Sequence, residues 1–155
     1  MDFQISGLPL ASFAPLFSLS DAQLAKRNVV RQVVETSPGT PCRVSLQDAE
    51  PGEKVLLLNY EHLPVSSPYR AAHAIFVREN AVEAKPGVNE IPDVLARRLL
   101  SLRAYDSKGM MLAADVVQGR EMQPIIDTMF ADANVAYIHA HNAKPGCFAA
   151  RIDRA

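Results

Sequence analysis

Alternating and clustered apolar residues predict β-strands along much of the chain. The β-branched segment from Val29 to Glu35 is followed by two prolines and a glycine, which predicts a strand and then a loop. Cys42 to Leu46 alternates polar and apolar residues, and Lys54 to Tyr60 is a denser apolar run. These two segments are predicted to pair as antiparallel neighbours, and His73 to Glu79 predicts a further strand.

The second half of the chain predicts two β-hairpins. Leu99 to Asp106 and Met110 to Val117 flank a short Ser-Lys-Gly turn, in which Gly109 can adopt a positive φ. Val135 to Arg154 predicts a final hairpin around a Pro-Gly turn. Between the earlier strands, the segment from Leu63 to Ala72 contains two prolines and predicts a surface loop.

Three short segments predict helices. Ser20 and Gln23 form a capping-box pattern at the start of a helix that runs from Asp21 to about Arg27. A second short helix is expected near Pro92 to Arg98. Met122 to Ala131 places apolar residues at helical spacing, and its proline falls in the first turn, where a helix tolerates it.

Strands therefore outnumber helices, and consecutive strands are joined by short turns instead of crossover helices. This pattern predicts an α+β fold with a single globular domain over residues 1–155. We expect a largely antiparallel sheet of about six to eight strands with two or three short helices packed on it. A chain of 155 residues with 48% apolar and 21% charged residues can bury an ordinary core.

Composition and charge exclude several classes of function. A formal net charge of −1 provides no field that would attract nucleic acid or an anionic membrane, so neither is expected as a partner. No glycine-rich phosphate motif occurs, which excludes nucleotide binding by those motifs. The amino-terminal region lacks the basic residues of a secretory signal, and no apolar run approaches the length of about 18 residues that spans a bilayer. We therefore expect a cytoplasmic protein, with Cys42 and Cys147 as reduced thiols.

The final hairpin holds the densest group of reactive side chains. His139 and His141 are predicted to share one face of a strand, because side chains alternate with a period of two. The position of Cys147 depends on the register of the hairpin. If His141 lies opposite Cys147, all three side chains share a face, whereas pairing Asn142 with Cys147 turns the thiol to the other face.

A metal site is one interpretation of this hairpin. His139, His141 and Cys147 would suit zinc or another borderline metal, with His73 or His62 completing the ligand set. The alternative is a pair of solvated or core histidines beside a small buried thiol. Apart from this zinc hypothesis, the sequence indicates no cofactor.

Cysteine and arginine residues suggest other chemistry. Cys42 or Cys147 would be a nucleophile if a histidine such as His73 or His139 activated it, and the alternative is a small buried residue. Arginines recur on or beside the predicted strands, and several of them converging on one pocket would select a small anion. Solvated strand faces and salt bridges are the alternative for these arginines. They are Arg43, Arg70, Arg78, Arg103 and Arg151.

Three groups of segments carry a family resemblance. They are Pro41–Leu46 with Asp48–Glu53, Ser67–Tyr69 with His73–Val77, and Tyr137–His139 with Asn142–Ala143 and Gly146–Phe148. In these segments, and in Leu102–Asp106, the chain resembles the bacterial family called domain of unknown function 1203 (DUF1203), over nearly its full length. The resemblance implies a free-standing small bacterial protein, and it implies no activity and no catalytic residues.

Three hypotheses of function follow. The leading one is a cytosolic protein that binds or transforms a small molecule, an anion if the arginines converge on it. Its site would be assembled from Arg43, Tyr69, His73, His139, Asn142 and Cys147. The alternative is a non-catalytic interaction module or homodimer, in which these residues satisfy buried hydrogen bonds. The third hypothesis is a metal-dependent enzyme with histidine and cysteine ligands.

Overall fold

The computed structural model describes residues 1–155 and contains eight strands, four α-helices and two 3-10 turns. The strands are β1 (Phe3–Ser6), β2 (Val30–Val33), β3 (Lys54–Leu63), β4 (Ala71–Arg78), β5 (Leu99–Tyr105), β6 (Met111–Gln118), β7 (Tyr137–Asn142) and β8 (Phe148–Arg154). The helices are α1 (Ala14–Phe17), α2 (Asp21–Ala25), α3 (Asp93–Ala96) and α4 (Met122–Phe130), with 3-10 turns η1 (Leu10–Ser12) and η2 (Gly119–Glu121).

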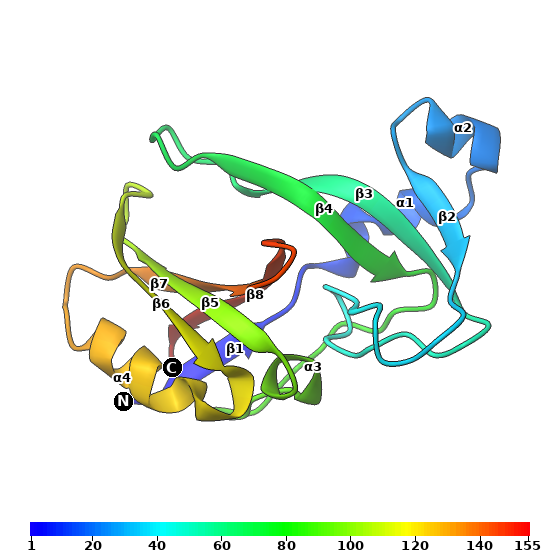
Figure 1. The fold of residues 1–155 in the computed structure, drawn as a ribbon. Helices are drawn as coiled ribbons and strands as arrows, with labels where there is room; N and C mark the ends of the chain where they lie inside the picture. The colour runs from blue at the N-terminus through cyan, green and yellow to red at the C-terminus, as the bar shows by residue number, and fades with distance from the viewer.

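The strands form two antiparallel sheets, which confirms the predicted α+β class. The larger sheet has the order β1-β8-β7-β5-β6, and the smaller one has the order β2-β3-β4. The predicted number of strands is correct, but they are divided between two sheets instead of forming one. In Figure 1 the hairpin β3-β4 extends from the smaller sheet across one face of the larger sheet.

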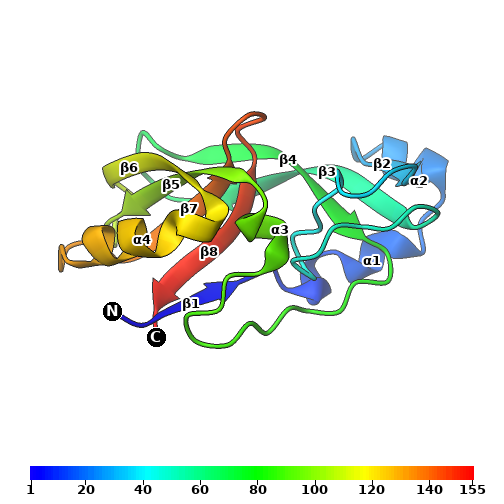
Figure 2. The ribbon, with the colours of Figure 1, turned by 60° about the horizontal axis from the view of Figure 1, so that its bottom comes forward.

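The two faces of the larger sheet differ in what covers them. Helices α3 and α4 lie against the face opposite the β3-β4 hairpin, as Figures 1 and 2 show. The main apolar core fills this helix-covered side and includes Leu100, Leu102, Ile126, Ile138 and Ile152. A second core lies under the smaller sheet. The face of the larger sheet beneath β3-β4 is the one that carries the histidines described below.

Local signals in the sequence placed several elements correctly. The amide of Gln23 donates to Ser20 Oγ at 3.2 Å, and the amide of Ser20 donates to Gln23 Oε1 at 2.9 Å, so the predicted capping box starts α2. Gly109 has a φ of 80° in the turn between β5 and β6. The strand β1 and the short helix α1 were not predicted.

The segment Cys42 to Leu46 is a turn, and the predicted strand is wrong. The amide of Leu46 donates to the Cys42 carbonyl at 3.1 Å, and the Cys42 amide donates to the Gln47 carbonyl at 2.9 Å, so the backbone closes into a turn. Single backbone hydrogen bonds join this turn to Leu8, Phe76 and Ala84, and it does not pair with β3. The alternation of residue types does not reveal that Arg43 is only 2% exposed, because its burial depends on contacts with β8.

The contact between η2 and α3 gives a test of this packing. A Cβ atom added at Gly119 would lie 1.8 Å from the Leu95 carbonyl oxygen, so Gly119→Ala forces the two elements apart. We expect this variant to lose about 3 kcal/mol of unfolding free energy in urea titrations. Gly39→Ala is the matched control, because no atom lies within 4 Å of the added Cβ. Equal losses in the two variants would contradict the packing.

Candidate functional site

The β7-β8 hairpin separates its histidines from its cysteine. Ala140 pairs with Ala150 but His141 pairs with Phe148, so Ala149 is an extra residue that forms a bulge in β8. The Asn142 amide then donates to the Cys147 carbonyl at 2.9 Å. Of the two predicted registers, the structure has the one in which Asn142 faces Cys147 and the thiol leaves the histidine face. His139, His141 and Cys147 are therefore not assembled into one ligand set.

His139 and His141 instead lie beside a third histidine, His62, at the end of β3. The ring centroids are 4.9 Å apart for His62 and His141, 6.0 Å for His62 and His139, and 6.2 Å for His139 and His141. Phe148 packs among them and stacks on His62 at 5.4 Å. The three rings and Phe148 form the contact between the β3-β4 hairpin and the larger sheet, and we call this group the histidine cluster.

Several ring nitrogens of the histidine cluster have no hydrogen-bond partner. Both nitrogens of His62, Nδ1 of His139 and Nε2 of His141 are buried and unpaired. Nδ1 of His141 lies 3.0 Å from the Gly146 carbonyl. A carbonyl oxygen only accepts hydrogen bonds, so Nδ1 of His141 carries the proton and Nε2 carries the lone pair.

The histidine cluster is neutral at pH 7. Burial lowers the pKa of His139 to about 3, with further lowering by the charges of His141 and His62. Burial also lowers the pKa of His141 to about 3 and that of His62 to about 4, and Arg103 contributes to both shifts. No group of three His, Cys, Asp or Glu side chains in the structure is arranged to hold a metal ion.

Cys147 lies on the opposite side of the hairpin, against Arg43. The Arg43 guanidinium donates from Nη2 to Cys147 Sγ at 2.9 Å and from Nε to the Phe148 carbonyl at 2.6 Å, and its Nη1 donates to the Pro41 carbonyl. The side-chain amide of Asn142 also donates to Cys147 Sγ, at 3.5 Å. Burial lowers the pKa of Arg43, and the nearby Cys147 and Cys42 partly offset this effect.

A cavity of about 510 Å³ adjoins this group, and we call it the Arg43 cavity. It is formed by β3, β4, the loop around Pro41, the start of β5 and the turn of the β7-β8 hairpin. Four of the six residues predicted for the site line it: Arg43, His73, Asn142 and Cys147. The sequence thus identified most of the polar residues that the fold brings to this cavity.

The other two predicted residues lie elsewhere. His139 belongs to the histidine cluster. Tyr69 is 39% exposed in the loop after β3 and packs edge-on against Tyr105. Cys42 is buried in the second core, where its Sγ accepts hydrogen bonds from the amides of Arg78 and Ser45. None of these three side chains lines the Arg43 cavity.

The predicted arginines do not converge on one pocket. Arg43 alone among them lines the Arg43 cavity. The others have separate partners: Arg70 pairs with Glu61, Arg78 with Glu53 and Arg151 with Asp153, and Arg103 donates to Ser101. These four arginines therefore form salt bridges or contacts on strand faces, which was the alternative to a shared anion site.

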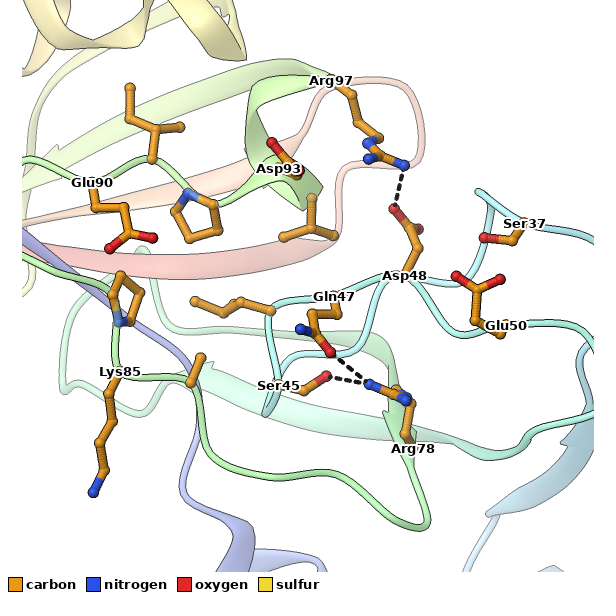
Figure 3. Close-up of a pocket in the computed structure, with 16 residues that line it drawn as sticks. Ser37, Ser45, Gln47, Asp48, Glu50, Arg78, Lys85, Glu90, Asp93 and Arg97 are labelled. Atoms are coloured by element: carbon orange, nitrogen blue, oxygen red, sulfur yellow. Dashed lines mark hydrogen bonds and ion pairs between the residues drawn. The ribbon is translucent and has the colours of Figure 1, made fainter.

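A larger cavity, of about 640 Å³, lies between the 45–50 loop and the segment that leads into α3. Figure 3 shows its charged lining, with Arg97 paired to Asp48 at 3.5 Å and Arg78 bonded to Ser45 and Gln47. Three basic and four acidic side chains line it, so their charges nearly cancel. Arg78, which was considered for anion binding, lines this cavity. The other predicted site residues do not.

Sequence reasoning missed three residues that contribute to these sites. His62 was considered only as a fourth metal ligand, because β3 was predicted to end at Tyr60 and it continues to Leu63. Arg98 and Lys144 line the Arg43 cavity but were not selected. The Lys-Pro-Gly sequence at the hairpin turn was the available signal for Lys144, since the turn places that lysine in the lining of the cavity.

The fold and the cavity define an α+β protein of two antiparallel sheets with a basic pocket at the junction of the smaller sheet and the last hairpin. No helix in it has the length and apolar character needed to cross a bilayer. The chain belongs to the DUF1203 family, a family described as protein of unknown function, whose model matches residues 39–154. No curated protein and no solved structure matches the chain.

Acidification is expected to destabilise the protein through the histidine cluster. The pKa values of His62, His139 and His141 lie below their ordinary value of 6.5, so the unfolded chain binds more protons than the folded one below that pH. Stability is complete above about pH 6.5 and falls as the pH drops towards 4. Each histidine contributes about 1.4 kcal/mol per pH unit.

Urea unfolding at a series of pH values between 7 and 4.5 measures this slope. His139→Phe and His141→Phe each remove one titrating ring, so each variant should take up about one proton fewer on unfolding. If the unfolding free energy of both variants changed with pH as steeply as that of the unmodified protein, the histidine cluster would not be the cause of the pH dependence.

Proposed function

We propose that the protein binds a small organic anion with an apolar body in the Arg43 cavity, as a cytoplasmic bacterial protein. The observation that carries this proposal is the charge of the lining. Arg43, Arg98 and Lys144 line the cavity together with His73, and no aspartate or glutamate does. A ligand with a carboxylate or a similar acidic group would complement this lining.

Arg43 is the strongest argument for a negative charge in the ligand. It is 2% exposed, and none of the ion pairs in the structure includes it. A buried charge without a counter-ion is unfavourable, and an anion in the adjoining cavity would compensate it. Of the five guanidinium N–H groups, three donate to protein acceptors, which leaves donors for a ligand.

Arg98 and Lys144 differ in whether an acidic side chain already compensates their positive charge. Arg98 already pairs with Asp48, at 2.5 Å from its Nη2, so its charge is largely compensated. Lys144 is exposed in the hairpin turn and forms no ion pair. Lys144 is therefore the residue that attracts an anion at the cavity mouth, while Arg43 holds it inside.

The remaining walls define the rest of the ligand. Leu57, Phe76 and Leu99 supply apolar and aromatic surface, and Pro41 and Pro145 add to it. The volume of about 510 Å³ is in the range of pockets that enclose small molecules. A carboxylate attached to a ring or a short alkyl chain would satisfy both the charge and the walls.

Thermal unfolding with matched pairs of small molecules tests the proposal. Benzoate, phenylacetate and hexanoate are each compared with the corresponding neutral amide, so that only the charge differs. A carboxylate at about 100 times its dissociation constant should stabilise the folded state by about 2.7 kcal/mol, and the amide should do so much less. Equal effects of acid and amide, or no effect of any pair, would contradict the proposal.

Variants then locate the binding site. Lys144→Glu should weaken carboxylate binding at least about tenfold, because it reverses the charge at the cavity mouth. Lys108→Glu makes the same change at an exposed turn away from the cavity and should leave binding unchanged. His73→Ala, a change in the cavity wall, should also weaken binding. Equal weakening by the two lysine variants would mean that only the net charge of the protein matters.

A further inference from the structure

Cys147 is the one thiol that lines the Arg43 cavity. Its sulfur receives two hydrogen bonds from buried groups, one from Arg43 Nη2 at 2.9 Å and one from Asn142 Nδ2 at 3.5 Å. These two donors fix the position of the sulfur at the cavity wall, and the thiolate is the form of cysteine that attacks other atoms. The cavity therefore combines a basic lining with a sulfur that is held in position.

Asn142 gives a second, independent indication of a ligand at this place. Its side chain is 6% exposed and lines the cavity, and Oδ1 has no hydrogen-bond partner in the protein. Buried polar atoms are nearly always paired, so an unpaired oxygen in a residue that lines a cavity points to a missing donor. A ligand that carries an amide or ammonium N–H as well as an acidic group would supply it.

The other cysteine lacks all of these features. Cys42 is 1% exposed in the second core, lines no part of the cavity and accepts hydrogen bonds only from backbone amides. It therefore serves as an internal control for any reaction at Cys147. Because Cys42 lies outside the cavity, Cys147 has no second thiol beside it. A mixed disulfide formed at Cys147 therefore has no neighbouring cysteine to resolve it.

We infer that Cys147 is a thiolation site for anionic low-molecular-weight disulfides that enter the Arg43 cavity. This inference rests on the proposed function and names the chemical class of its ligand. The Cys147 thiolate attacks one sulfur of the ligand disulfide, a protein–ligand S–S bond forms, and the ligand S–S bond breaks. The departing sulfur takes the electron pair and then a proton from solvent. Cys147 is oxidised to the disulfide, and the released half of the ligand is reduced to a thiol.

The basic lining gives the reaction its selectivity. Lys144 at the mouth and Arg43 inside attract carboxylates of the disulfide, and Asn142 Oδ1 accepts from one of its N–H groups. A disulfide that carries only ammonium groups would meet repulsion from the same residues. A comparison of anionic and cationic disulfides therefore distinguishes binding in the cavity from the general reactivity of an accessible thiol.

Intact-mass measurements on the folded full-length protein test the inference. The reagents are glutathione disulfide, which is anionic, and cystamine, which is cationic. Each rate is divided by the rate of the same reagent with an unstructured cysteine peptide. We expect one glutathione adduct per chain, mapped to Cys147 by peptide analysis, and a normalised rate at least about tenfold above that of cystamine. Lys144→Glu should reduce this ratio, and Lys108→Glu should not.

Three results would overturn the inference. They are adducts mapped to Cys42, adducts that form only in urea, and a normalised rate with cystamine equal to or above that with glutathione disulfide. Mapping is done on the unmodified chain, so the test does not depend on the folding of a variant. Cys42→Ser should retain the adduct and Cys147→Ser should lose it.

The inference and the proposed function fail in different ways. Stabilisation by benzoate or its analogues is measured on the unmodified chain without any disulfide, so it reports anion binding independently of the reaction at Cys147. If carboxylates bind and Cys147 does not react, thiolation is wrong and anion binding stands. If Cys147 reacts but carboxylates and amides bind alike, the proposed function is wrong, and the inference that rests on it is overturned as well.

Discussion

The buried guanidinium of Arg43 joins the parts of the molecule that form the candidate site. It lies in a turn after the smaller sheet's first strand, and it donates to the backbone of Pro41 in that turn and of Phe148 in β8. The same group donates to Cys147 Sγ. Hydrogen bonds from a charged donor are worth about 1.5 to 3 kcal/mol each, so this one side chain fixes the turn against the last hairpin. The position of the cavity depends on this connection.

The bulge at Ala149 has a comparable effect on the chemistry of the last hairpin. By inserting one residue into β8, it places His141 opposite Phe148 and Asn142 opposite Cys147. The hairpin therefore presents neutral, apolar-packed histidines to the β3-β4 hairpin on one side. On the other side it presents a thiol and an amide to a basic cavity. Two surfaces with different chemistry arise from one strand pair because of a single residue.

The two surfaces have different physical roles. The histidine cluster is closely packed with Phe148 and contributes to the contact between the sheets, which makes that contact sensitive to acid. The Arg43 cavity has open volume, a lining of one sign of charge and an unpaired Asn142 oxygen. Empty space and unsatisfied polar groups are features that ligands complete, whereas filled aromatic contacts are features that stabilise a fold.

Much of the fold was predictable because it depends on neighbouring residues. The capping box at Ser20 and the turn at Gly109 act within a few residues, and both were predicted correctly. The segment Cys42 to Leu46 was predicted wrongly because the burial of Arg43 depends on β8, which is over 100 residues away in sequence.

The candidate site was predictable in part for the same reason. Residue type was enough to select Arg43, His73, Asn142 and Cys147, which the fold brings together. The register of the last hairpin could not be decided, because a bulge leaves no clear sign in the alternation of side chains. His139 lies in the histidine cluster and away from Cys147 for that reason, and His62 was considered only as a metal ligand because β3 extends beyond its predicted end.

A crystal structure of the protein with the carboxylate that stabilises it most would show directly whether the Arg43 cavity binds anions. We expect a bound carboxylate whose oxygens lie within hydrogen-bond distance of Arg43 or Lys144, with its apolar part against Leu57 and Phe76. A carboxylate bound in the cavity lined by Arg78 and Asp48, or against the histidine cluster, would contradict it.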